Sequence, residues 1–178
     1  SGLTAGLLAW RYGPGIEFPV YLVFTGLLIV ASGIDLECFI LPDGITLGGA
    51  LLAVPAAVFA LGMHWSDVLL GAALGGGTFL AVLLVFRHLR GVDGMGLGDV
   101  KLMLMLGALC GPMALPLVTL VAGIAALVAF VIIACIAPRE APLRETPIPF
   151  GPFLSLGAFV HILAGSEILD WWIQFIAG

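Results

Sequence analysis

Apolar runs and short polar segments alternate along the whole chain. A membrane-crossing helix needs about 20 mostly apolar residues. Four runs come close to that length or exceed it, at 18–34, 45–62, 68–86 and 113–136, and three shorter ones lie at 3–12, 99–110 and 150–164. Lipid offers the backbone no hydrogen-bond partners, so each run must satisfy its own backbone as a helix. The pattern predicts an all-α fold: a polytopic transmembrane helical bundle with about six full or partial spans, forming one membrane domain over 1–178.

Composition supports this fold class and excludes several functions. Hydrophobic residues make up 62% of the 178 and charged residues 10%, whereas soluble domains carry about 25% charged residues. With six Lys and Arg residues and a net charge of −5, the chain lacks the basic surface that nucleic-acid binding requires. Its three cysteines, at 38, 110 and 135, form no Cys-x-x-Cys pair and no Cys/His cluster. We therefore expect no metal site and no bound cofactor.

The basic residues predict the orientation of the helices. If each long run crosses the membrane once, three polar segments share one side, at 35–44, 87–98 and 138–149. That side carries most of the arginines, namely Arg87, Arg90, Arg139 and Arg144, and the opposite side carries Arg11. Basic residues concentrate on the cytoplasmic side of membrane proteins. Asp35 and Asp99 are therefore expected on the same, cytoplasmic face.

A glycine-rich stretch leads into one of these aspartates. Gly94, Gly96 and Gly98 precede Asp99, and an apolar run begins directly after it. Glycine allows another backbone to approach closely, so the stretch indicates a carboxylate at the mouth of a membrane helix with room beside it for an extended peptide. An ionisable residue at that depth is a candidate for function because its burial is costly. The alternative is that Asp99 only caps the next helix.

Two carboxylates at similar depth have a definite chemical use. If they approach each other, repulsion and partial desolvation make the pair share a proton near neutral pH. The ionised member can then activate water while the protonated member polarises a peptide carbonyl, which is the logic of aspartic proteolysis. A serine mechanism needs a histidine near a serine. The three histidines, at 64, 88 and 161, have no partner at a recognisable spacing.

Three sequence blocks resemble one known family. They are Asp35 followed by Ile-Leu-Pro-Asp-Gly-Ile-Thr-Leu at 40–47, Gly-Met-Gly-Leu-Gly-Asp-Val-Lys at 94–101, and Thr-Pro-Ile-Pro-Phe-Gly-Pro-Phe-Leu at 146–154. In this order they are similar to the signature blocks of bacterial type IV prepilin peptidases. That resemblance implies a membrane aspartic endopeptidase of the bacterial inner membrane. It would remove the basic leader from type IV prepilins and type II secretion pseudopilins at the cytoplasmic face.

The resemblance also implies roles for individual residues. Asp35 and Asp99 occupy the positions of the two catalytic aspartates. The supporting motif residues are Pro42, Asp43, Gly96, Gly98 and Lys101, of which Asp43 shapes the turn after Pro42 and transfers no proton. The Lys101 ammonium would favour an ionised Asp99 or hold a lipid headgroup. An interfacial lysine that snorkels toward water is the alternative.

The sequence departs from the family at its start. Many members carry an additional span and a cytoplasmic domain with zinc-binding cysteine pairs, and they also methylate the new N-terminus of the product. No paired cysteines occur here. We therefore expect either a fragment of a bifunctional protein or a short, protease-only member, without N-methyltransferase activity.

Two other classes of function compete with the peptidase. A small transporter could use Asp35 and Asp99 for proton or ion passage, but the helices are almost wholly aliphatic. A non-catalytic assembly scaffold would leave both aspartates without a role. The expected partners are a prepilin or pseudopilin helix and membrane lipid, and the sequence does not define an oligomeric state.

Overall fold

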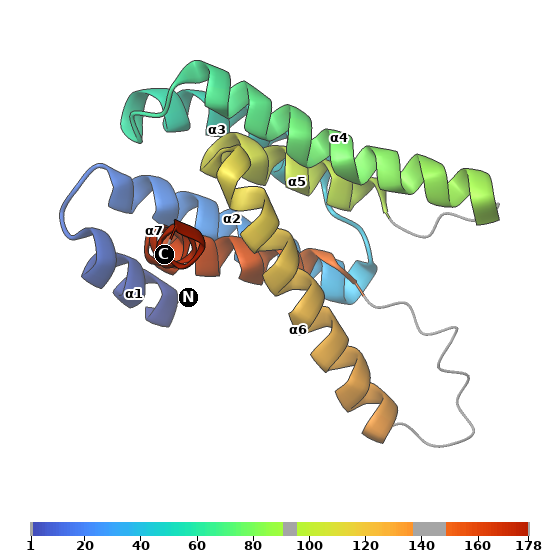
Figure 1. Cartoon of the computed structure of the whole chain (residues 1–178). Helices are drawn as coiled ribbons and strands as arrows, with labels where there is room; N and C mark the ends of the chain where they lie inside the picture. The colour runs from blue at the N-terminus through green and yellow to red at the C-terminus, as the bar shows by residue number, and fades with distance from the viewer. Residues whose placement is uncertain (1, 91–95, 137–148, 178) are drawn as a thin grey trace.

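The computed structural model describes residues 2–90, 96–136 and 149–177, and helices form almost all of them (Figure 1). Within these ranges there is no strand. The elements in chain order are α1 (Gly2–Tyr12), α2 (Glu17–Cys38), α3 (Asp43–Pro55), the π-helical turn η1 (Ala56–Ala60), α4 (Trp65–Arg90), α5 (Leu97–Cys110), the 3-10 turn η2 (Pro112–Ala114), α6 (Leu115–Ile136) and α7 (Gly151–Ala177). The predicted all-α fold is confirmed.

Five helical segments are long and apolar enough to cross a membrane. They are Glu17–Cys38, Asp43–Ala60, Trp65–Leu89, Pro112–Ile136 and Gly151–Trp172. With 11 and 14 residues, α1 and α5 are shorter than the about 20 residues that a bilayer requires. This combination of full and partial spans confirms the predicted polytopic bundle.

Two helices extend beyond the ends that the apolar runs predict. The run at 18–34 predicts a helix that ends before Asp35, whereas α2 continues through Asp35 to Cys38. Neither glycine nor proline interrupts residues 35–38, and the Phe39 N–H closes the last turn by donating to the Asp35 carbonyl at 2.9 Å. The prediction for the last helix ended at 164, but α7 runs to Ala177. Asp35 therefore lies on a helix and not in the polar segment after it.

The short helix α1 packs against the bundle although it cannot cross a membrane alone. Leu8 is fully buried, and the Tyr12 ring lies 4.8 Å from that of Tyr21 on α2, between centroids. Arg11 contacts α7 through an ion pair of 2.6 Å with Glu167 and through hydrogen bonds of 3.0 Å to the Leu163 carbonyl and 2.9 Å to Ser166 Oγ. The short run at 3–12 therefore forms a partial span that packs against α2 and α7.

The most buried helix is α5, which packs against α3, α4 and α7. Nine of its 14 residues are buried, because a helix that is apolar on all sides is stable only when other elements surround it. Glycines let α4 approach it closely. A Cβ at Gly71 would collide with the Gly107 carbonyl, and a Cβ at Gly107 with the Gly71 carbonyl. The two backbones are therefore in direct contact, as in other membrane helix pairs with small residues at the interface.

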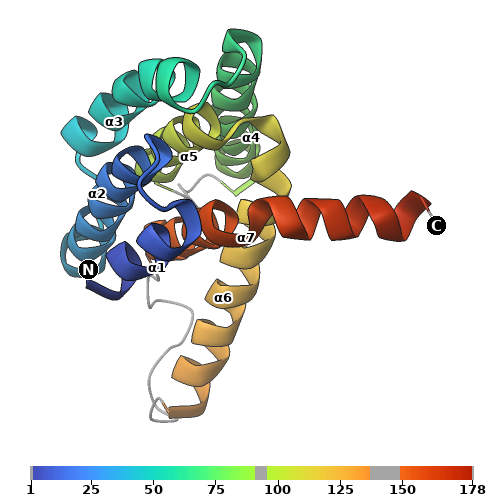
Figure 2. The ribbon, with the colours of Figure 1, turned by 90° about the vertical axis from the view of Figure 1, so that its left-hand side faces the viewer.

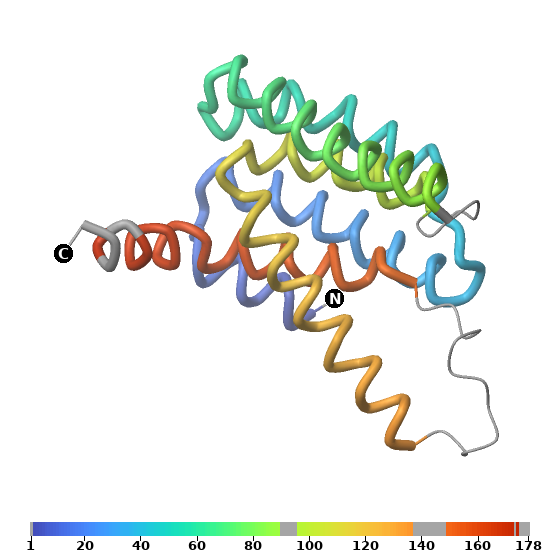
Figure 3. The backbone as a smooth tube through the Cα atoms, turned by 45° about the vertical axis from the view of Figure 1, so that its right-hand side comes forward, coloured from blue at the N-terminus to red at the C-terminus, as the bar shows by residue number. Residues whose placement is uncertain are grey.

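The helix ends that carry the motif residues gather at one end of the bundle. Figure 1 shows the C-terminal ends of α2 and α4 beside the N-terminal ends of α5 and α7. The C-terminal half of α6 diverges from the other helices, and the C-terminal half of α7 extends away from this end (Figures 2 and 3). This arrangement confirms that Asp35 and Asp99 share one end of the molecule. Residues 91–95 and 137–148, with Arg139, Arg144 and parts of two motif blocks, lie outside the described ranges.

Candidate active site

The first candidate carboxylate belongs to the last turn of α2. Asp35 is 6% exposed, and its Oδ2 accepts a hydrogen bond of 3.1 Å from the backbone N–H of Gly151. Gly151 is the first residue of α7. The first N–H groups of a helix have no partner within it, so the start of α7 supplies a donor for an acidic side chain. Asp35 is therefore held between two helices that are distant in sequence.

The backbone turns sharply after α2. Phe39 adopts a left-handed conformation with φ of 55°, which for a non-glycine residue costs about 1–2 kcal/mol. Helices that end this way usually place glycine at such a position. Such strain occurs preferentially at functional sites. Here the turn sends residues 39–42, which we call the connecting loop, from the end of α2 to the start of α3.

The second candidate carboxylate belongs to the first turn of α5. Asp99 is 7% exposed, and the extended backbone of Gly96 precedes the helix. Since α5 is not one of the five spanning segments, Asp99 lies outside them. Burial, followed by the negative charge of Asp35, raises the pKa of Asp99 to about 6, and a hydrogen bond from the Gly96 backbone opposes this rise. Asp99 therefore retains its proton to higher pH than an ordinary aspartate.

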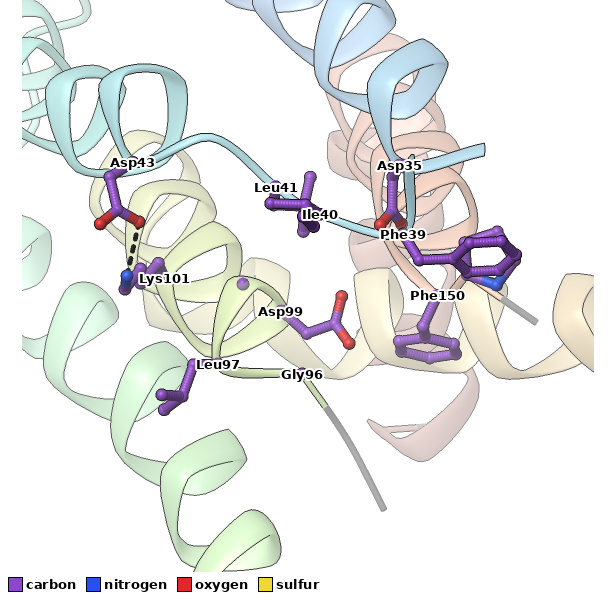
Figure 4. Close-up of a pocket in the computed structure, with 12 residues that line it drawn as sticks. Asp35, Phe39, Ile40, Leu41, Asp43, Gly96, Leu97, Asp99, Lys101 and Phe150 are labelled. Carbon is purple, nitrogen blue, oxygen red and sulfur yellow. Dashed lines mark hydrogen bonds and ion pairs between the residues drawn. The ribbon is translucent and has the colours of Figure 1, made fainter. Parts of the chain in front are cut away.

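The two carboxyl groups face the same cavity. In Figure 4, Asp35 from α2 and Asp99 from α5 turn their side chains toward one another. The cavity has a volume of about 560 Å³. It is lined by the two carboxylates and by apolar, glycine and charged residues, namely Phe39, Ile40, Leu41, Asp43, Gly96, Leu97, Gly98, Lys101, Pro149 and Phe150. The geometry thus places two acids beside a space that is large enough for a short stretch of peptide.

Leu41 fills the space between the starts of α5 and α7. It is 7% exposed. A Cβ at Gly98 would lie 2.8 Å from the Leu41 Cβ, and a Cβ at Gly151 would lie 3.3 Å from its Cδ1. Gly96 has more room, because a Cβ there would be 4.0 Å from Asp99 Oδ2. Packing therefore requires glycine at 98 and 151, whereas at 96 a larger residue would meet only ordinary contact distances.

The supporting charged residues contact each other. Lys101 Nζ lies 2.5 Å from Asp43 Oδ1 in an ion pair between α5 and the start of α3. One of the roles expected for Lys101 is to favour an ionised Asp99, but its ammonium points away from that side chain, toward Asp43 (Figure 4). Pro42 precedes α3, and its carbonyl accepts hydrogen bonds from the N–H groups of Ile45 and Thr46 at 3.0 and 3.1 Å. This geometry agrees with a turn-forming role for the Pro42–Asp43 pair.

Sequence reasoning did not assign roles to three residues at this site. Gly151 donates to Asp35, Leu41 separates two helix starts, and Phe39 forms the left-handed turn. A signal for Gly151 was available, since Pro152 is favoured in the first turn of a helix and thus marks the free N–H groups just before it. The positions of Leu41 and Phe39 depend on how three helices meet, which local sequence does not reveal.

The arrangement favours acid–base chemistry by side chains. Within the described ranges, no three His, Cys, Asp or Glu side chains are grouped so that they could hold a metal ion. A buried pair of carboxyl groups that shares protons can supply both a general base and a general acid. These two functions are sufficient to activate a water molecule against a carbonyl group.

Comparison with known proteins identifies the class of protein that carries this site. Residues 22–132 match the type IV leader peptidase family, and both Asp35 and Asp99 fall within the matched stretch. The chain belongs to that family.

Curated relatives extend the match over nearly the whole chain. A prepilin leader peptidase/N-methyltransferase of Stutzerimonas stutzeri is 34% identical over 174 residues, 98% of this chain and 59% of the relative. Proteins with the same name from Pseudomonas aeruginosa and Xanthomonas campestris are 34% and 35% identical, over 98% and 93% of this chain. The chain spans about three fifths of the length of these relatives. No solved structure matches the chain significantly.

Proposed function

We propose that this chain is an aspartic endopeptidase that cleaves the leader peptide from type IV prepilins and type II secretion pseudopilins. The observation that carries the proposal is the pair of buried carboxyl groups, Asp35 and Asp99, facing one cavity from two helices. Membership of the type IV leader peptidase family and the names of the relatives support it. The family match therefore agrees with the resemblance of the three sequence blocks to prepilin peptidases.

The geometry suggests different roles for the two aspartates. Asp35 already accepts a hydrogen bond from Gly151 at Oδ2, the arrangement of an ionised carboxylate, and its other oxygen is left to accept a proton from water. Burial and the charge of Asp35 raise the pKa of Asp99 to about 6, and we take Asp99 as the member of the pair that retains a proton. We therefore assign Asp35 as the general base and Asp99 as the general acid.

The reaction follows from these assignments. A water molecule between the carboxyl groups loses a proton to Asp35 and attacks the scissile carbonyl carbon, while the Asp99 proton hydrogen-bonds to the carbonyl oxygen. When the tetrahedral intermediate collapses, the C–N bond breaks and the leaving nitrogen takes a proton from the pair. Each proton that one carboxyl group accepts is later returned, so the pair is regenerated.

The substrate we propose is the junction between a basic leader and an apolar helix. Five helices long and apolar enough to cross a membrane, together with the bacterial relatives, support a multi-pass protein of the bacterial inner membrane. The excess of arginines on one side supports a site at the cytoplasmic surface. The glycine-lined start of α5 would accept an extended peptide, and the apolar part of the substrate would remain in lipid. We propose prepilin or pseudopilin and membrane lipid as the partners.

Other functions find less support. The matched family is a peptidase family, so the comparisons do not support the transporter alternative. The relatives' names include N-methyltransferase. We propose only the peptidase activity for these 178 residues.

Substitution of each aspartate tests the proposal. Asp35→Asn and Asp99→Asn should each abolish cleavage of a prepilin, because the amide has nearly the same volume but cannot exchange a proton. The measurement is the mobility shift of the processed product on a gel, with the variants purified in parallel and their helical content compared. Zinc chelators and serine reagents should not reduce the parent's rate. Full cleavage by both Asn variants would refute an aspartic mechanism.

A further inference from the structure

We propose that Lys101 and Asp43 form a positioning pair that sets the separation of the two carboxyl groups by fixing the connecting loop. The inference rests on the proposed peptidase activity and assigns the pair no contact with the reacting atoms. Their ion pair joins α5 to α3 at 2.5 Å, and α5 is the helix that carries Asp99.

Lys101 is rigidly connected to Asp99. The two residues lie in the first turns of α5, two positions apart, so their side chains leave the helix in different directions. In Figure 4, Asp99 points toward Asp35 and Lys101 points toward Asp43. A force on the Lys101 ammonium is therefore transmitted to the backbone that carries Asp99.

Asp43 is connected to the other half of the site through the connecting loop. It begins α3, directly after the loop. Within the loop, Leu41 lies against the positions of Gly98 and Gly151, where an added Cβ would come within 2.8 and 3.3 Å of its side chain. Gly151 is the residue whose N–H holds Asp35. The loop thus contacts both the helix of Asp99 and the hydrogen-bond donor of Asp35.

These contacts form a continuous path from one carboxyl group to the other. From Asp99 the path follows α5 to Lys101, crosses the ion pair to Asp43, and passes through Leu41 to Gly151 and Asp35. If the pair is removed, the start of α3 loses its ion pair with α5. Leu41 can then move away from Gly98 and Gly151. The separation of the two carboxyl groups would then no longer be fixed by this path.

The pair should affect catalysis far more than folding. The Asp43 side chain is 64% exposed and that of Lys101 is 29% exposed, and exposed ion pairs contribute little to stability. Cleavage depends strongly on geometry, since a displacement of about 1 Å can reduce a rate about 100-fold. A positioning role therefore predicts a lower kcat in a protein that is folded normally.

The experiment uses single substitutions and a charge exchange in the full chain. Lys101→Met and Asp43→Asn should each lower kcat on a prepilin by about 10- to 100-fold, with KM and the melting temperature nearly unchanged. Some cleavage should remain, in contrast to Asp35→Asn. Lys101→Arg should retain most of the activity because it keeps the cation. Glu37→Gln, which removes an exposed acid from the end of α2 outside the cavity lining, is the matched control and should cleave like the parent.

Double variants test whether the two residues act together. Lys101→Met combined with Asp43→Asn should be no slower than either single variant, because both remove the same contact. The exchange Lys101→Asp with Asp43→Lys should recover part of the lost rate. If Lys101→Met fails to fold, the arginine variant and the exchange still carry the test, since each retains opposite charges at the two positions.

Three outcomes would overturn the inference. They are single variants that cleave at the parent's rate, losses that multiply in the double variant, and a fall in kcat that is matched by a lower melting temperature. Failure of the proposed function gives a different result, because Asp35→Asn and Asp99→Asn would then cleave in the same assay. If Asp35→Asn and Asp99→Asn are inactive while Lys101→Met and Asp43→Asn cleave at the parent's rate, only the proposed positioning role is refuted.

Discussion

Gly151 is constrained both by a hydrogen bond and by close packing. Its N–H holds Asp35, and its missing side chain leaves room for the carboxylate that it binds. A Cβ at this position would lie 2.6 Å from Asp35 Oδ2, closer than any carbon and oxygen atom pack without bonding. Gly151 therefore both donates the hydrogen bond to Asp35 and, because it has no Cβ, lets the Asp35 carboxylate approach its backbone.

Gly151→Ala should therefore reduce cleavage about 100-fold or more, because the methyl group displaces Asp35 from the position that its geometry requires. Initial rates on a prepilin measure this effect. Gly44→Ala is the control, since a Cβ at Gly44 would meet nothing within 4 Å. Equal rates for the two alanine variants would show that the Gly151 contact does not position Asp35.

At the scale of elements, the short helix α5 depends on its neighbours. It buries apolar side chains on several sides and cannot cross a bilayer alone, so α3, α4 and α7 must surround it. The contact between the α4 and α5 backbones requires glycine on both helices. The position of Asp99 is thus determined by the packing of an entire helix, not only by its glycine-rich entrance.

Gly71→Ala should destabilise the protein by about 1–3 kcal/mol, because the added methyl group overpacks the contact with the Gly107 carbonyl. Thermal unfolding in detergent, followed by circular dichroism, measures the change. The matched control is Gly77→Ala on the same helix, where a Cβ would meet nothing within 4 Å. It should be neutral or stabilise by about 0.5–1 kcal/mol, because alanine favours helix over glycine. Similar losses in both variants would contradict the assigned α4–α5 contact.

At the scale of the whole molecule, the site exists only when distant parts of the chain assemble. Asp35, Asp99 and Gly151 come from α2, α5 and α7, and the carboxyl groups of such a pair titrate together. Below both pKa values of the pair no base is available, and above both no acid is available. The active, singly protonated form therefore occupies an intermediate range of pH.

The pH dependence of cleavage should consequently be bell-shaped. Because Asp99, with a pKa of about 6, is assigned as the acid, kcat/KM should fall as the pH rises through about 6. The fall in kcat should occur at higher pH, since bound substrate excludes water and further disfavours the ionised form. Rates measured across this range on one prepilin test the assignment. A kcat/KM that instead rises through pH 6 would assign Asp99 as the base.

Much of this protein could be predicted from its sequence because the relevant physics is local. Lipid forces apolar runs to become helices, so the helical fold and most of the spans followed from hydrophobicity alone. Asp35 and Asp99 stood out because carboxylates are rare in such segments. The distribution of basic residues among alternate loops then predicted that Asp35 and Asp99 share one face of the membrane. The helix ends were less accurate, since Asp35 lies within α2 and α7 extends to Ala177.

Tertiary structure decided how the site is built. No local pattern indicated that Lys101 pairs with Asp43, that Leu41 lies between Gly98 and Gly151, or that the start of α7 donates to Asp35. These contacts join residues from 57 to 116 positions apart in the chain, and they depend on the angles at which helices meet. Sequence determined which segments become apolar helices and which carboxylates lie near their ends, because hydrophobicity and charge act residue by residue. Packing determined which of them touch, because contact distances depend on every helix at once.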